Sequence, residues 1–403
     1  MNVCVLAPFR VVPQMSGAAR RVFEICTALS SGGVSVILLH AGASGLVQPG
    51  LRVIGFPALE NSVVTKHFTW SGAIDTYLSS VNLALCRKLI QVMNRTKIDI
   101  LQLEGPWSIL ATKLANAIAG KTPFVYDSHN VESLSVRFSS SVGWIWPFVA
   151  LMEKETVRHS ELVFCVSELD KTNMCSLYGL PDRKIVVVPN GVRNSNYRIK
   201  SGTQIRKRLD LPIHTKIIFF HGELAWKPND EAARTIVESM ASHFESQETV
   251  FLIAGPHPSR KLLRDASRRP NVRILGYVPD VAQYVCAADV CIAPLTTGSG
   301  TKLKILEYFA AGKPVVATQK AVEGLAVADG IQALVLNDTR EEFICAIRAA
   351  LMPELSHRLG ETAKAFAEGL EWSIIAKKIV RAYESVVDRH HKQVSEESRL
   401  LIR

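Results

Sequence analysis

One segment in the second half of the chain combines glycines, lysines and a carboxylate at close spacing. Residues 293–307 read A-P-L-T-T-G-S-G-T-K-L-K-I-L-E, so a strand is expected to end near Pro294 and a helix to begin shortly afterwards. Glycines let a ligand approach the backbone closely, and the first N–H groups of a helix attract anions. The pattern therefore predicts a phosphate site at the turn, which is formed by Gly298, Ser299, Gly300 and Thr301.

The charged residues of this segment fit the same chemistry. Lys302 and Lys304 add positive charge beside the turn, and Glu307 lies two helical turns further on. A carboxylate there is placed to accept hydrogen bonds from the paired hydroxyls of a ribose. The alternative is an ordinary glycine-rich helix start, in which Lys304 and Glu307 form a solvated i,i+3 pair.

Continuous apolar runs alternate with helix-length segments along the whole chain, as in parallel sheets that helices cover on both faces. In the first half we expect strands at 3–7, 35–39, 52–56, 98–103, 123–126, 162–166 and 185–188. In the second half we expect them at 217–220, 250–254, 272–275, 290–293, 315–317 and 333–336. Helical spacing is found in residues 20–29, 111–119, 230–246, 281–287, 302–311 and 341–351.

The length of the chain, and the separate series of alternating strands and helices in each half, predict two domains. The chain has 403 residues, and a domain takes roughly 100–200. We expect one Rossmann-like domain at 1–190, a polar and basic linker at 191–213, and a second Rossmann-like domain at 214–371. Residues 372–403 are expected to form a helix to about residue 389, free to cross back to the first domain, and then a fraying tail. Two such doubly wound α/β domains predict a ligand-binding cleft between them, where their strand ends face each other.

Composition and charge exclude several classes of protein. The net charge is +10, with an excess of five positive charges in residues 1–195 and the same excess in 196–403. The basic clusters lack the interleaved aromatic residues of a nucleic-acid-binding surface. The eight cysteines include no C-x-x-C pair, so neither a metal site nor a disulfide framework is indicated. No apolar run reaches the roughly 20 residues of a membrane helix, and the N-terminus is typical of a strand rather than a signal peptide. The expected compartment is the cytoplasm.

The 298–307 segment resembles the nucleotide-binding signature of retaining glycosyltransferases of the GT-B fold, in particular family 4, also called group 1. It is most similar to the branch that reads G-x-G-T-[RK]-x-K-x-L-E. Further landmarks of the family follow in the same order over almost the whole chain. They lie at residues 16–17, 32–34, 127–132, 166–167, 188–192, 222–229, 253–256 and 275–278.

The resemblance implies an enzyme that moves a sugar from a nucleoside-diphosphate sugar to a glycan, a lipid-linked acceptor or a small molecule. The domain at 1–190 would bind the acceptor, and the domain at 214–371 would bind the donor. No cofactor or metal would be required, and no enzyme nucleophile is assigned. The implied donor-binding residues are Ser16, Gly17, Gly222, Lys227, Tyr277, Val278, Gly298, Ser299, Gly300, Thr301, Lys302 and Glu307.

His129 is the implied catalytic residue, lying near the anomeric carbon of the donor sugar. Ser16 and Gly17 would approach the phosphate or the sugar, and Tyr277 and Val278 would hold the base through their main chain. For His129 the alternative is a loop histidine that is hydrogen-bonded to Asp127.

The sequence departs from the wider family at its diphosphate and sugar contacts. Ser299 stands eight residues before Glu307, where many members have a glutamate that contacts sugar hydroxyls. Glu223 and Pro228 occupy the positions of the family's phosphate-binding arginine and lysine, with Lys227 one residue early. Trp226 is therefore expected to pack under the glycine loop.

Aromatic residues in the first half of the chain allow two interpretations. They could contact a membrane that holds a lipid-linked acceptor, or pack in the core or in a lid, and we favour packing. The residues are Phe68, Trp70, Trp144, Trp146 and Phe148.

Two other functions remain open. One is a sugar-nucleotide epimerase of the same fold, although its catalytic histidines and carboxylates have no match here. The other is a binding subunit without turnover, which the changes at Glu223 and Pro228 keep open. A Rossmann dehydrogenase is disfavoured because no G-x-G-x-x-G follows the first strand.

Overall fold

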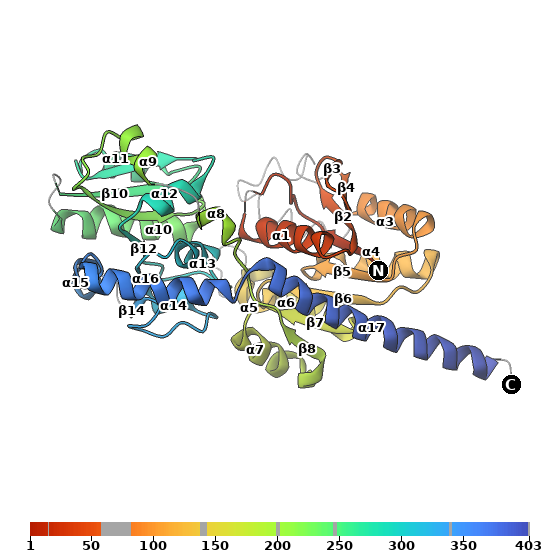
Figure 1. Ribbon diagram of the computed structural model, residues 1–403. Helices are drawn as coiled ribbons and strands as arrows, with labels where there is room; N and C mark the ends of the chain where they lie inside the picture. Colours follow the sequence, from red (N-terminus) through yellow and green to blue (C-terminus); the bar gives the residue numbers. More distant parts are fainter. Residues whose placement is uncertain are drawn as a thin grey trace. The chain divides into compact units, whose positions relative to one another are not determined.

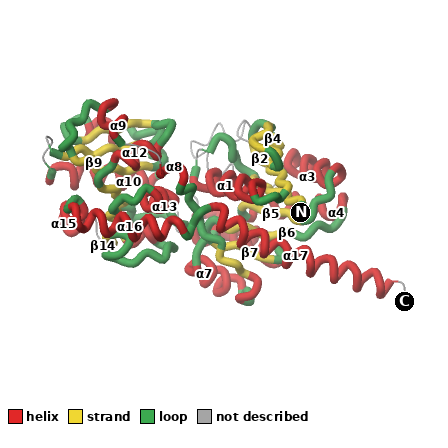
Figure 2. The backbone as a smooth tube through the Cα atoms, in the orientation of Figure 1, coloured by secondary structure: helices red, strands yellow, loops and turns green. Residues whose placement is uncertain are grey.

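The computed structural model describes residues 1–14, 16–57, 82–137, 143–198, 202–244, 248–337 and 341–401. The chain forms two compact units (Figure 1). Unit 1 is Met1–Pro189 with Trp372–Arg403, and unit 2 is Asn190–Glu371. In each unit the strands form a sheet with helices around it (Figure 2). The structure confirms the expected α/β class with two Rossmann-like sheets.

The described part of unit 1 holds an eight-stranded sheet in the order β3-β4-β2-β1-β5-β6-β7-β8. Every neighbouring pair is parallel except β3 and β4. The seven predicted strands all appear, and β3 is an additional short edge strand. The bounds are β1 (Asn2–Ala7), β2 (Ser35–Ala41), β3 (Gly45–Gln48), β4 (Leu51–Phe56), β5 (Ile100–Glu104), β6 (Phe124–Ser128), β7 (Leu162–Cys165) and β8 (Ile185–Val187).

The helices of unit 1 include α17, the last helix of the chain. It packs against α1, so the chain returns to unit 1 after unit 2 has been built. The expected tail is helical instead, because α17 continues through residue 390 to Leu401. The bounds are α1 (Gly17–Ser31), α3 (Leu83–Arg95), α4 (Ile109–Ala119), α5 (Glu132–Arg137), α6 (Trp146–His159), α7 (Glu168–Tyr178) and α17 (Trp372–Leu401).

The sheet of unit 2 has six parallel strands in its described residues, in the order β11-β10-β9-β12-β13-β14. Phe219, Phe251 and Phe309 are among its fully buried side chains, and burial of such a side chain stabilises the fold by about 1.5–3 kcal/mol. The strands are β9 (Lys216–His221), β10 (Thr249–Ala254), β11 (Val272–Gly276), β12 (Val290–Ala293), β13 (Val315–Thr318) and β14 (Leu334–Leu336).

Each of the four predicted helical segments of unit 2 contains a helix, and α8, α9, α11, α14 and α16 are additional. The segment 230–246 is shorter and less regular than expected, since α10 gives way to a π-helical turn at Ile236–Met240 and a 3₁₀ turn at Ala241–His243. The bounds are α8 (Ser195–Arg198), α9 (Thr203–Arg208), α10 (Lys227–Thr235), α11 (Arg260–Ala266), α12 (Val281–Ala287), α13 (Leu303–Ala310), α14 (Gln319–Val322), α15 (Glu341–Ala350) and α16 (Pro353–Glu368).

The stretch expected as a linker, 191–213, is part of unit 2 in the structure. It contains α8 and α9, and the side chains of Tyr197 and Ile205 are buried in the core of that unit. The polar composition of the stretch concealed these few apolar anchors. Of the aromatic residues singled out above, Phe68 and Trp70 lie outside the described residues.

Candidate active site

Two carboxylates are buried at the carboxyl ends of neighbouring strands in unit 1, Glu104 on β5 and Asp127 on β6. Arg21 of α1 compensates Asp127: its Nε and Nη2 donate to the two carboxylate oxygens at 3.2 and 2.8 Å. The same guanidinium donates to the carbonyls of Val188 and Pro189 at 3.0 and 3.2 Å. Because both charges are buried, the pair holds α1 firmly against the sheet.

His129 lies beside the second carboxylate. Its Nε2 is 2.7 Å from Glu104 Oε2, so Nδ1 is the ring nitrogen that is left for another partner. Burial lowers the pKa of His129, but the hydrogen bond to Glu104 and the charges of Glu104 and Asp127 outweigh it, so the pKa is raised. The alternative for His129, a hydrogen bond to Asp127, does not occur, since Asp127 binds Arg21 and His129 binds Glu104.

A pocket of about 350 Å³ opens at this end of the sheet. Ser16 caps α1 by accepting from the backbone N–H of Ala19 at 3.2 Å, and Gly17 is the first helical residue. The first N–H groups of α1 and the guanidinium of Arg10 make the pocket suitable for an anionic group. Its lining residues are Phe9, Arg10, Ser16, Ala18, Glu104, Gly105, Trp107, His129, Asn130 and Glu132.

Glu132 is a titratable residue of this pocket for which no role was predicted. Burial, followed by the charge of Glu153, raises its pKa from 4.5 to about 7. The Glu153 carboxylate is fixed by the backbone N–H groups of Glu132 and Ser133, at 2.9 and 3.0 Å. A carboxyl that titrates near neutrality is suited to proton transfer with a hydroxyl group.

Glu104, Asp127 and His129 also have the residue types of a metal site, with ligand atoms within 4.8 Å of one another. Their polar atoms are already engaged. Asp127 binds Arg21 through both oxygens, and Glu104 accepts from Gln102 and contacts His129. The Arg21 guanidinium and the ring N–H of His129 thus occupy the places beside the carboxylates that a metal cation would take. The cluster is therefore not an open cation site.

Glu307 is the central carboxylate of unit 2. It lies on α13, is 6% exposed, and its Oε2 is 3.1 Å from Nε2 of His221, the last residue of β9. The His221 ring stacks on Phe219 at a centroid distance of 5.7 Å, and its backbone N–H donates to the Tyr308 hydroxyl at 3.2 Å. The histidine therefore lies within ion-pair distance of the carboxylate at the carboxyl edge of the sheet.

The glycine loop before α13 is rigidly supported. Gly298 and Gly300 have φ of 106° and 67°, which favours glycine, and a Cβ on Gly298 would lie 2.9 Å from the Trp226 ring. Trp226 thus contacts the loop closely, as the sequence indicated. The Lys302 ammonium donates to the carbonyls of Ser299 and Gly300, so it binds the loop itself.

Thr301 and Lys304 add two further links around the loop. The Thr301 hydroxyl accepts from Nδ2 of Asn190 at 2.6 Å. The Lys304 ammonium donates to Oδ1 of Asn229 on α10 at 2.7 Å and lies 4.3 Å from the centre of the Phe220 ring. Burial, followed by the charge of Lys302, lowers the pKa of Lys304 from 10.5 to about 7.

The remaining predicted residues are more exposed. The Lys227 side chain is 75% exposed and pairs with Glu231 at 3.7 Å. Tyr277 is 62% exposed and, with Val278, follows β11 at the same sheet edge. Gly222 follows β9, where a Cβ would lie 2.6 Å from the Asn229 side chain.

The two positions that depart from the family make local contacts. Glu223 accepts from Nδ1 of His257 at 2.9 Å when that nitrogen is protonated. Pro228 lies in the first turn of α10, and its Cγ would be 3.4 Å from a Cβ on Gly298. Neither replaces a cationic phosphate contact.

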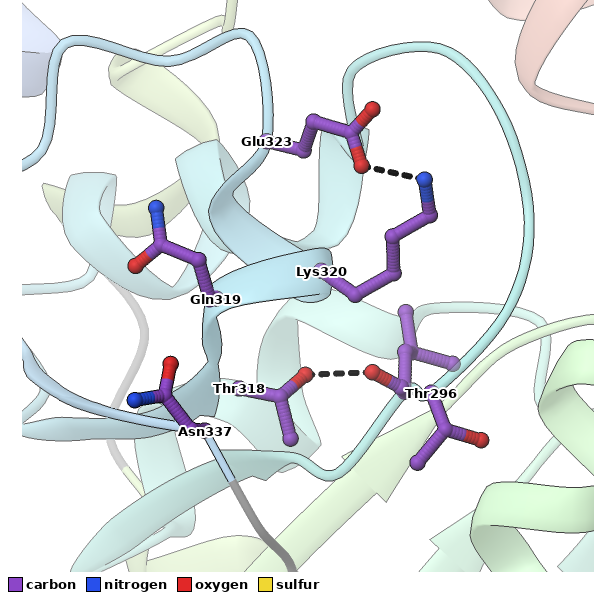
Figure 3. Close-up of a pocket in the computed structure, with 7 residues that line it drawn as sticks. Thr296, Thr318, Gln319, Lys320, Glu323 and Asn337 are labelled. Atoms are coloured by element: carbon purple, nitrogen blue, oxygen red, sulfur yellow. Dashed lines mark hydrogen bonds and ion pairs between the residues drawn. The ribbon is translucent and has the colours of Figure 1, made fainter.

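A second pocket, of about 410 Å³, lies at the ends of β12, β13 and β14 in unit 2 (Figure 3). Lys320 and Glu323 form an ion pair on one side of it, and the amides of Gln319 and Asn337 lie on the other. This mixture of donors and acceptors can hydrogen-bond a polyhydroxyl group. The remaining lining residues are Leu295, Thr296 and Thr318.

The structure brings the predicted residues together in two groups, one in each unit. Ser16, Gly17 and His129 lie around the unit 1 pocket, and the others lie around the glycine loop and the ends of β9 and β11. Several residues of these sites were not predicted from the sequence. Two of them, Glu104 and His221, are polar residues at the ends of buried strands, a position that could have indicated a site. The residues not predicted are Arg21, Gln102, Glu104, Glu132, His221, Asn229 and Tyr383.

Two paired Rossmann-like units with these sites define the class of GT-B glycosyltransferases, and comparisons with known proteins agree. Residues 15–195 match the family model described as glycosyltransferase family 4, and residues 215–352 match glycosyl transferases group 1. The chain belongs to the family 4, group 1 glycosyltransferases.

Curated relatives are similar at low identity. The D-inositol 3-phosphate glycosyltransferase of Acidothermus cellulolyticus is 27% identical over 58% of this chain and 55% of its own. The phosphatidylinositol N-acetylglucosaminyltransferase GPI3 subunit of Saccharomyces cerevisiae is 25% identical over 75% of this chain and 65% of its own. The chain thus spans between about half and two thirds of the length of these relatives.

Solved structures share the fold over nearly the whole chain. Anabaena Alr3699/HepE, solved in complex with UDP and glucose, matches with a TM-score of 0.70 and 18% identity, covering 95% of this chain and 99% of that one. Sucrose-phosphate synthase from Thermosynechococcus elongatus matches with a TM-score of 0.79 and 16% identity, covering 96% and 100%.

The buried amine of Lys304 predicts a pH-dependent stability. Its pKa is about 7 in the folded chain but 10.5 when unperturbed, so between these values the unfolded chain binds more protons and stability rises with pH. Urea denaturation of the full chain and of Lys304→Met, at pH 7 and pH 9, measures this effect. We expect the free-energy difference between wild type and variant to shift by about 2 kcal/mol in favour of wild type at the higher pH. A difference that stays constant with pH would contradict the assignment.

Proposed function

We propose that the protein transfers a sugar, with retention of anomeric configuration, from a nucleoside-diphosphate sugar to an acceptor. The observation that carries this proposal is the carboxylate of Glu307, which lies within ion-pair distance of His221 beside a glycine loop that opens α13. A carboxylate about one turn from the start of α13 is spaced to receive a ribose while the diphosphate lies over the loop. The bound UDP and glucose of the HepE structure support the same donor class.

The charge that develops on the leaving diphosphate needs preorganised donors. We assign this role to the N–H groups of the loop from Gly298 to Lys302, which are supported from below by Trp226. Gly222 allows close approach of the backbone at the neighbouring strand end, and Tyr277 with Val278 holds the base. Lys227 is exposed and free to move toward the phosphates when its pair with Glu231 breaks. No metal or other cofactor takes part in this proposal.

Unit 1 supplies the groups for the reacting sugar and the acceptor. His129 presents Nδ1 to the donor sugar near its anomeric carbon, and Ser16 and Gly17 approach the phosphate or the sugar. The pocket lined by Ser16 and His129 is also lined by Arg10 and by Ala18 of the first turn of α1, so we propose an acceptor with an anionic group. The names of the two curated relatives, which refer to inositol phosphate and phosphatidylinositol, support such an acceptor. No enzyme nucleophile is assigned.

Two alternatives are kept as outcomes of experiment. A binding subunit without turnover is favoured by the contacts of Glu223 and Pro228, which leave the usual cationic positions without a cation. A sugar-nucleotide epimerase of the same fold would change the donor without an acceptor. Release of UDP from a UDP-sugar distinguishes the transferase from both.

Substitution of Glu307 tests the donor site. A hydrogen bond to a charged group contributes about 1.5–3 kcal/mol, so Glu307→Ala is expected to weaken UDP binding by about 10–150-fold. The control is Glu361→Ala, an exposed carboxylate on α16 of the same unit. Calorimetric titration with UDP, GDP and ADP measures the affinity and identifies the base. An unchanged UDP affinity in a folded Glu307→Ala variant would refute the ribose role.

We also propose that the protein works in the cytoplasm at the inner face of a membrane. Trp144 and Phe148 are 76% and 45% exposed, whereas Trp146 packs beside the buried Trp107 and Val149. Leu110, Leu114 and Ile118 of α4, a helix that contacts α6, are exposed as well. Among the described helices none is both long and apolar enough to span a bilayer, so the contact would be peripheral.

Vesicle binding tests the membrane contact. We expect sedimentation with vesicles of phosphatidylcholine and phosphatidylglycerol to fall at least about fivefold in the double variant Trp144→Ser, Phe148→Ser, because two apolar side chains leave the interface. The control is Leu169→Ser, an exposed apolar residue of α7. Equal sedimentation of the double variant and wild type would exclude this surface.

A further inference from the structure

A chain of buried polar side chains continues inward from His129. Its ring contacts Glu104 Oε2, and Glu104 Oε1 accepts from Nε2 of Gln102 at 2.6 Å. The Tyr383 hydroxyl of α17 donates to Oε1 of the same Gln102 amide. Glu104, Gln102 and Tyr383 are all completely buried. The last helix of the chain thus reaches the candidate catalytic histidine through three hydrogen bonds.

We propose that Tyr383, Gln102 and Glu104 are positioning residues that hold His129 in one orientation and one tautomer for sugar transfer. The proposal rests on the proposed function of His129. Tyr383 is at the far end of this hydrogen-bonded network, and it lies 254 positions from His129 in the sequence. No motif of the sequence connects the two.

The direction of the hydrogen bonds follows from the chemistry of the amide. A glutamine amide has one acceptor and one donor end, and the two are exchanged when it rotates. Because the Tyr383 hydroxyl donates to the oxygen, the NH₂ group must face Glu104. Without that hydroxyl the amide oxygen loses its donor, and the NH₂ group is held less firmly against Glu104.

The Glu104 carboxylate needs this support because its surroundings oppose its charge. Burial, followed by the charge of Asp127, raises its pKa, while the hydrogen bonds from His129 and Gln102 lower it. A carboxylate that remains ionised holds a proton on Nε2 of His129 and directs Nδ1 elsewhere. Carboxylates orient metal-binding histidines in the same way, by accepting from the ring N–H that does not face the metal.

Other charged groups face His129 from each neighbouring element. They are Asp127 at the end of β6, Arg21 on α1, Glu132 at the start of α5, and Arg10 in the segment after β1. Arg21 binds Asp127, and Glu132 accepts from Asn130 at 2.8 Å. The hydrogen-bonded route from Tyr383 to His129 runs through Gln102 and Glu104.

Tyr383→Phe is the sharpest variant, because it removes one hydroxyl and keeps the ring that packs against Phe164 at a centroid distance of 6.1 Å. The matched control is Tyr178→Phe, which removes a hydroxyl that donates to another buried carboxylate, Glu153, at 2.7 Å. Glu104→Gln is the second variant, in case Tyr383→Phe does not fold. NMR titration of labelled histidine in the full chain, with the His129 signal assigned by its loss in His129→Gln, gives the pKa without any substrate.

We expect the pKa of His129 to fall by about half a unit in Tyr383→Phe and by at least about one unit in Glu104→Gln. In Tyr178→Phe it should stay at the wild-type value. With UDP-glucose as probe, Tyr383→Phe should lower kcat for UDP release by about tenfold and leave KM within about twofold, since orientation and not binding is lost.

The proposed positioning of His129 by Tyr383, Gln102 and Glu104, called the relay below, would be overturned by either of two results. One is an unchanged pKa of His129 in both variants, and the other is a shift in Tyr178→Phe as large as that in Tyr383→Phe. If the pKa of His129 shifts as expected but the wild type does not turn over UDP-sugars, the relay would be supported and the proposed function overturned. A tenfold loss of kcat without a shift of the His129 titration would also count against the relay, because it would show a general structural effect.

Discussion

Two buried carboxylates at adjacent strand ends impose the main constraint on unit 1. Glu104 and Asp127 are fully buried, and neither could remain ionised without partners. Arg21, from α1, compensates Asp127 and also binds two carbonyls after β8, while His129 and Gln102 contact Glu104. Loss of one partner from a buried ion pair typically costs about 3–5 kcal/mol. The first helix, the strand ends and the last helix are therefore all held at one place, where the pocket opens.

Unit 2 places its charges differently. The ammonium groups of Lys302 and Lys304 are turned toward loop carbonyls and toward Asn229, and the residues at the family's usual cationic positions are Glu223 and Pro228. In our proposal the diphosphate therefore meets backbone N–H groups and the start of α13, with the lysines rigidifying the loop from within. Binding would then depend on a preformed backbone geometry more than on mobile cations.

The sequence predicted the elements well and the contacts poorly, for identifiable reasons. All thirteen predicted strands exist, because runs buried on both faces give a strong apolar signal. The edge strand β3 and the apolar anchors Tyr197 and Ile205 were missed, since short or mainly polar segments carry little periodicity. The roles of Ser16, Gly222 and the other donor residues stay predictions.

The polar network is where local sequence patterns fail most clearly. Gln102 lies in an apolar strand and Tyr383 in an amphipathic helix, and in neither does the local pattern show which partner the polar group will have. Their contact depends on the return of α17 to unit 1, which the sequence pattern allowed without indicating which residues would meet. In contrast, Glu307 was found because the glycines that precede it in the chain mark the start of a helix.

The most direct test of the account is to follow UDP-sugars by proton NMR in the presence of the full chain. The account predicts that one of UDP-glucose, UDP-galactose or UDP-N-acetylglucosamine releases UDP, with water as a slow acceptor, and that the α-anomer of the free sugar appears first. Initial release of the β-anomer would contradict retention. Conversion of the donor to its epimer without release of UDP would contradict the transferase itself.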